Sequence, residues 1–96
     1  MPVRDDYEYV HISSAATTVV ASVPCKLIRI NVNTTANATT SIYNASTSST
    51  STSATAIGVL KANIAEGNQE YGVKLATGLT IVTLGASDLT VVYANA

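Results

Sequence analysis

The sequence of 96 residues contains no tryptophan and no phenylalanine, and tyrosine is its only aromatic residue. The largest apolar side chains are therefore missing, so Val, Ile and Leu must fill the core. A chain of this length forms one small domain that buries roughly 60–65% of its unfolded surface. We expect a single domain over residues 1–96 with a thin core that oligomerisation helps to stabilise.

Charged residues are also scarce, at 11% of the chain with a net charge of −1. An average soluble domain carries about 25%. Five dispersed Lys and Arg residues cannot form the basic stripe of a nucleic-acid-binding protein. No polybasic patch or apolar run of about 18 residues is present, so we expect no membrane partner. The uncharged surface suits contact with other proteins, or it is simply a surface of low charge.

The residues that most often carry chemistry are nearly absent. Cys25 and His11 are the only cysteine and histidine, which excludes an internal disulfide and falls short of a zinc site. No serine lies in a G-x-S-x-G context, and the five glycines are dispersed singly rather than gathered in a phosphate-binding loop. Glu66 and Glu70 are expected to flank a turn rather than to form a glycosidase pair. We predict a protein that is not an enzyme and that needs no cofactor or metal.

A period of two runs through the sequence. In residues 26–33 it places Ile28, Ile30 and Val32 on one face and Leu27 on the other, as in a half-buried strand. The chain contains eight short runs of this β-rich kind, at 7–13, 17–22, 26–33, 39–44, 56–62, 70–76, 79–84 and 88–94. Their spacing predicts an all-β fold: a single small antiparallel β-sandwich or jelly-roll-like domain of seven or eight short strands.

Turn residues separate these runs. Residues 85–88 form a short connection that predicts a hairpin between the last two strands. Gly78 and Gly85 can adopt positive φ at the turns that bound these strands. His11 is expected on the polar side of the first strand.

Residues 44–56 read NASTSSTSTSATA, and every residue from 46 to 53 is Ser or Thr. Such a tract cannot bury enough apolar area to offset the entropy of ordering. We predict a long loop between two strands, mobile or ordered by a partner, rather than an internal strand.

The stretches KLIRINVNTTANATTSIYN (26–44) and IGVLKANIAEGNQEYGVKLATGLTIVTLGASDLTVVYANA (57–96) resemble small virion proteins of tailed bacteriophages. The resemblance covers roughly residues 26–94 and does not extend to the Ser/Thr tract. It implies a β-sandwich or jelly-roll-like protein on the virion, most often a capsid decoration (cement) protein that stabilises the head by binding between capsomers.

The resemblance implies further expectations. The partners are the major capsid protein and the chain itself, as a homotrimer; the location is the capsid surface, after synthesis in the cytoplasm of a bacterial host. Extended segments of such a protein add strands to neighbouring subunits, and the candidates are an N-terminal arm at 1–6 and the loop at 44–56. The predicted interface residues are Val3, Arg4, Tyr7, Tyr9, Ser46, Thr47, Ser48, Ser49, Thr50, Ser51, Thr52 and Ser53.

Other functions stay open from the sequence. A head–tail junction or tail component would form a ring of five, six or twelve copies. A module that binds glycans or a host surface through its loops would need aromatic residues, and only Tyr43 and Tyr71 lie near turns. An ice-binding face is disfavoured because the Thr spacing follows no flat repeating lattice.

Overall fold

The computed structural model describes residues 7–47 and 55–95, which form eight strands. They are β1 (Glu8–Ile12), β2 (Ala16–Ala21), β3 (Cys25–Thr34), β4 (Thr40–Tyr43), β5 (Ala56–Leu60), β6 (Gly67–Leu75), β7 (Leu79–Thr83) and β8 (Asp88–Asn95). The predicted all-β fold is confirmed. The predicted N-terminal arm at 1–6 lies outside the described residues.

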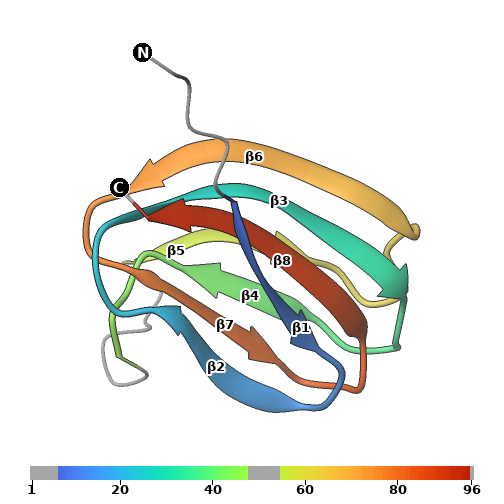
Figure 1. The fold of residues 1–96 in the computed structure, drawn as a ribbon. Coiled ribbons are helices and arrows are strands. Elements are labelled where there is room, and N and C mark those ends of the chain that lie inside the picture. Colours follow the sequence, from blue (N-terminus) through green and yellow to red (C-terminus); the bar gives the residue numbers. More distant parts are fainter. Residues whose placement is uncertain (1–6, 48–54, 96) are drawn as a thin grey trace.

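Two antiparallel four-stranded sheets pack face to face (Figure 1). Sheet A has the order β1-β8-β3-β6, and sheet B has the order β2-β7-β4-β5. This is the strand order of an eight-stranded jelly roll, which is built from two Greek keys. The structure therefore specifies the kind of β-sandwich that the sequence predicted more broadly.

The core lies between the sheets and consists of aliphatic side chains. Its members from sheet A include Leu27, Ile30 and Val91, and those from sheet B include Ile42 and Ile81, all fully buried. Tyr71 and Tyr93 pack against this cluster from strands, as expected from their apolar rings.

The prediction that Ile28 lies on the core face and Leu27 on the other is wrong. The inward and outward alternation of side chains in β3 is interrupted between Leu27 and Arg29. At this point the register of β3 shifts relative to both neighbouring strands, β6 and β8. Leu27 belongs to the core cluster, whereas Ile28 does not. Such a β-bulge places two residues against one and reverses the inward face of the strand.

The predicted hairpin of the last two strands is also wrong. β7 belongs to sheet B and β8 to sheet A, so the connection at residues 84–87 crosses between the sheets. The consecutive strands that do pair are β4 and β5, which flank the Ser/Thr tract. The described ends of the tract, residues 44–47 and 55–56, adjoin these two strands, and residues 48–54, on which the loop prediction mainly falls, lie outside the described residues.

Positive φ occurs at Gly67 and Gly72, not at Gly78 and Gly85 as predicted. Gly72 has φ 61° and lies where β6 places an additional residue opposite β3. Gly78 is required for a different reason, which is space. A Cβ there would lie 2.6 Å from the Ala21 carbonyl oxygen and 2.9 Å from that of Ala45.

Candidate functional site

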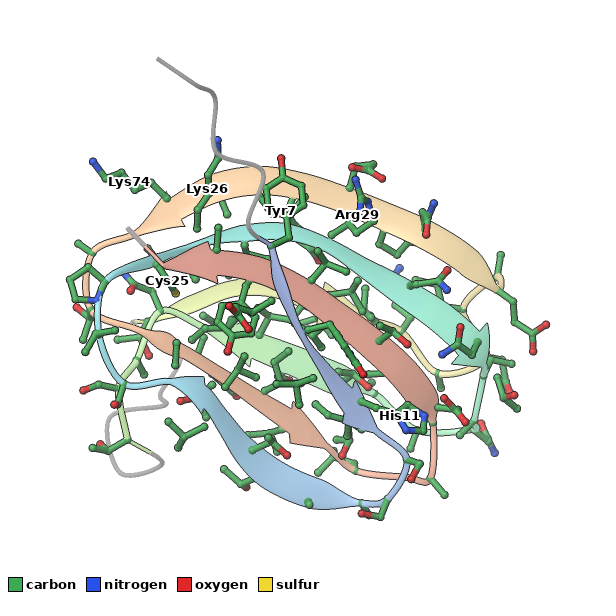
Figure 2. The ribbon with its side chains drawn as sticks, viewed as in Figure 1. Tyr7, His11, Cys25, Lys26, Arg29 and Lys74 are labelled. Atoms are coloured by element: carbon green, nitrogen blue, oxygen red, sulfur yellow. The ribbon has the colours of Figure 1, made fainter. Side chains whose placement is uncertain are left out.

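Of the predicted interface tyrosines, Tyr7 lies on the sheet A side of the sandwich (Figure 2), and Tyr9 belongs to β1 of the same sheet. Tyr9 is opposite Val92 of β8 and is 71% exposed, and Tyr7 immediately precedes β1 and is 48% exposed. Tyr9 points outward because its neighbours Val10 and Ile12 contact the core. Both rings are thus available to another molecule. The other predicted members of the N-terminal set, Val3 and Arg4, lie outside the described residues.

The described part of the Ser/Thr tract begins on sheet B. Ser46 is half-buried and Thr47 is exposed, while the predicted interface residues Ser48, Ser49, Thr50, Ser51, Thr52 and Ser53 lie outside the described residues. The structure does not bring Ser46 and Thr47 together with Tyr7 and Tyr9, because the two pairs follow different sheets.

Asn44 anchors the base of this loop. Its side-chain oxygen accepts hydrogen bonds from the backbone N–H groups of Thr77 (3.1 Å) and Gly78 (3.4 Å). The Thr80 hydroxyl donates to the Ala45 carbonyl at 2.9 Å, and Thr80 is fully buried beneath this contact. The start of the tract is therefore fastened across the outer side of β7.

A polar network lies on the outer face of sheet A. Asp88 Oδ1 is 2.6 Å from His11 Nε2 and accepts a hydrogen bond from Asn33 Nδ2 at 3.1 Å. Asn33 also donates to the Thr90 hydroxyl (3.0 Å) and accepts from Asn31 Nδ2 (2.7 Å). These bonds connect the outer sides of β1, β8 and β3. His11 is exposed, as predicted.

Two side-chain hydrogen bonds hold the pKa of Asp88 below its ordinary value. The larger effect comes from Asn33 and the smaller from His11. A depressed pKa in the folded state means that this carboxylate stabilises the fold above its unfolded pKa. The contribution is lost as the pH falls through the folded pKa. We predict that Asn33→Ala raises the pH at which Asp88 titrates, as followed by the NMR shift of its carboxyl carbon. An unchanged titration in the variant would contradict this assignment of the cause.

Two other features of the sheet A face involve charge. Arg29 Nε donates to Glu70 Oε2 at 3.1 Å across β3 and β6. Lys26 and Lys74 are direct cross-strand partners, and within residues 7–47 and 55–95 neither has an ion-pair partner. Like charges directly opposite each other are destabilising, and Figure 2 shows both side chains at the surface. An acidic group on a partner molecule would relieve this repulsion.

The outer face of sheet B was not identified from the sequence. The four strands of this sheet read ATTVVA, TSIY, AIGVL and LTIVT and contain no charged residue. We define the sheet B face by its outward residues Thr17, Val19, Ser41, Val59, Val82 and Leu84. Val19, Val59 and Leu84 are 43%, 54% and 65% exposed. Scarcity of charge was visible in the sequence, but its segregation to one sheet was not.

No pocket opens on the surface of the described part of the chain. Among the same residues, no group of three or more His, Cys, Asp or Glu side chains could hold a metal ion. No helix in these ranges could cross a membrane. Cys25 is fully buried at the start of β3, and burial raises the pKa of its thiol.

Comparisons of the chain with protein-family models, with curated proteins and with solved structures found no match.

Proposed function

We propose that the protein is a structural component of a tailed-bacteriophage virion. It acts as a capsid decoration protein, binding the major capsid protein between capsomers and stabilising the head without catalysis. The observation that carries the proposal is the pair of broad outer faces on a jelly-roll sandwich, in a surface without a pocket among the described residues. A protein that joins other proteins needs extended contact surfaces rather than a concave reaction site.

The phage assignment rests on the sequence resemblance and on the jelly-roll strand order, which is also found in viral capsid proteins. Jelly rolls occur in viral capsid proteins, but also in lectins and cupins, so the fold alone does not select a function. The surface favours protein contact. Tyr7 and Tyr9 expose large amphipathic rings of the kind enriched in interfaces, and the sheet A face presents the opposed Lys26 and Lys74.

The sheet A face is the surface that we assign to the capsid. Electrostatic complementarity would then place an acidic group of the capsid protein against Lys26 and Lys74. The exposed tyrosines, on β1 and immediately before it, would extend this contact toward the opposite edge of the same sheet.

The decisive experiment counts copies of the chain in purified phage particles by quantitative mass spectrometry against labelled peptides. A decoration protein is expected at several hundred copies per particle, because it occupies many equivalent sites on the shell. About a dozen copies or fewer would instead place the chain at the head–tail junction or in the tail. Its absence from the particle would contradict the virion assignment.

A further inference from the structure

The sheet B face has the composition of a surface that another protein covers. Six of the eight charged residues in the described ranges lie on strands of sheet A, and the other two, Lys61 and Glu66, lie in the connection between β5 and β6. Depletion of charge is the compositional signal of an interface core. The exposed Val19, Val59 and Leu84 add apolar area to it.

One row of side chains crosses the whole sheet. Thr17 of β2 is opposite Val82 of β7, Val82 is opposite Ser41 of β4, and Ser41 is opposite Val59 of β5. These residues point outward because alternate positions such as Ile81 and Ile42 are buried in the core. Smaller polar and larger apolar side chains therefore alternate along the row.

This row is complementary to itself. A two-fold axis parallel to the strands, between β7 and β4, would reverse the strand order of a second sheet B stacked on the first. Thr17 of one copy would then face Val59 of the other, and Val82 would face Ser41. Every larger side chain would oppose a smaller one, the arrangement that lets two packed layers interdigitate.

The same two-fold rotation also fits the residues at the end of the sheet B face. Leu84 is the most exposed large aliphatic residue in the described ranges, and its backbone N–H donates to the Thr39 carbonyl at 3.1 Å. Leu84 of one copy would therefore approach the Thr39 region of the other. At the opposite end the face is bounded by Ala45, which covers Thr80.

We propose that the occupant of the sheet B face is a second copy of this chain, stacked about this two-fold axis. A second copy meets both requirements of the surface: it brings no charge into the contact, and it supplies the reversed order of large and small side chains. Isologous contacts of this kind are the commonest in soluble oligomers. The inference is independent of the virion assignment, and it differs from the homotrimer predicted from the resemblance.

Sedimentation equilibrium of the full chain tests the proposal. The expected species has twice the chain mass of 9.9 kDa, or about 20 kDa. Val59→Lys and Thr17→Lys are each expected to weaken association by about 100-fold, because each variant buries two unpaired lysine charges in every dimer. Asn68→Lys, which adds the same charge at an exposed position of β6 in sheet A, is the matched control and should leave association unchanged.

A charge-swap variant tests the register. Residues 17 and 59 lie on opposite edges of sheet B, three strand spacings or about 14 Å apart, too far for an ion pair within one copy. Across the two-fold axis they face each other. The double variant Thr17→Glu/Val59→Lys is therefore expected to recover association by at least about tenfold over Val59→Lys alone, by forming two intermolecular ion pairs.

Circular dichroism of each variant separates loss of association from loss of folding. A monomeric or trimeric wild type would overturn the proposal, as would a dimer that folded Val59→Lys and Thr17→Lys variants leave intact. A charge-swap variant that is folded but no more associated than Val59→Lys would overturn the two-fold register. None of these results bears on the copy number in phage particles.

Discussion

Leu27→Thr is expected to lower the free energy of unfolding by about 3–5 kcal/mol, because it removes buried apolar atoms and places a hydroxyl in the core. Leu27 is fully buried and belongs to the cluster between the sheets. Domains of this size have about 5–15 kcal/mol of stability in total, so the loss is severe. Thermal unfolding should shift downward by more than about 12 °C.

Ile28→Thr is the matched control, with the same new residue at the adjacent position. Ile28 is 8% exposed but lies outside the core cluster, at the register shift of β3. We expect it to cost about 1–2 kcal/mol, since its side chain is not part of the cluster that fills the space between the sheets. Urea unfolding of both variants measures the difference. Equal losses, or a larger loss at Ile28, would show that β3 follows the unbroken alternation of its sequence.

Gly78→Ala is expected to destabilise the protein by about 3 kcal/mol, at the upper end of overpacking effects. The added Cβ would lie 2.6 Å from the Ala21 oxygen, 2.9 Å from the Ala45 oxygen and 3.0 Å from Ser46 Cα. All three are backbone atoms, so relief requires the chain itself to move. That movement would separate Asn44 from the N–H groups of Thr77 and Gly78, and we expect faster proteolysis at the loop as a second readout.

Gly58→Ala provides the comparison for this prediction. Its added Cβ would lie 2.9 Å from the Tyr71 hydroxyl oxygen and 3.3 Å from Cε1, which are atoms near the end of a side chain rather than backbone atoms. The expected cost is about 1 kcal/mol or less. Differential scanning calorimetry should give a clearly lower unfolding temperature for Gly78→Ala than for Gly58→Ala. The reverse order would contradict the close approach of the loop to β7.

The strand positions could be predicted because each strand carries its own evidence. The alternation in residues 79–84 places Leu79 and Ile81 inward, and both are fully buried. Strand pairing was not predictable in the same way. A short connection such as 84–87 serves a hairpin and a crossing between two sheets equally well, and the choice depends on which neighbours complete each sheet.

The candidate surfaces show the same division. Exposure of Tyr9 and His11 followed from their positions in an alternating strand, and both are exposed. Their assignment to an interface remains a prediction. The network around Asp88 joins residues 77 positions apart in the sequence, and no local pattern marks such a meeting.

The sequence by itself determined that this protein is all-β and where its strands lie. It also determined that charged residues are too few to cover the surface as they do in an average soluble domain. These properties follow from a period of two and from composition, which are local. Only the tertiary structure decided that β2, β4, β5 and β7 share one sheet, and therefore that their charge-free outer sides form one continuous face. Neighbours within a sheet are selected by long-range hydrogen bonding and core packing, to which residues distant in the sequence contribute together.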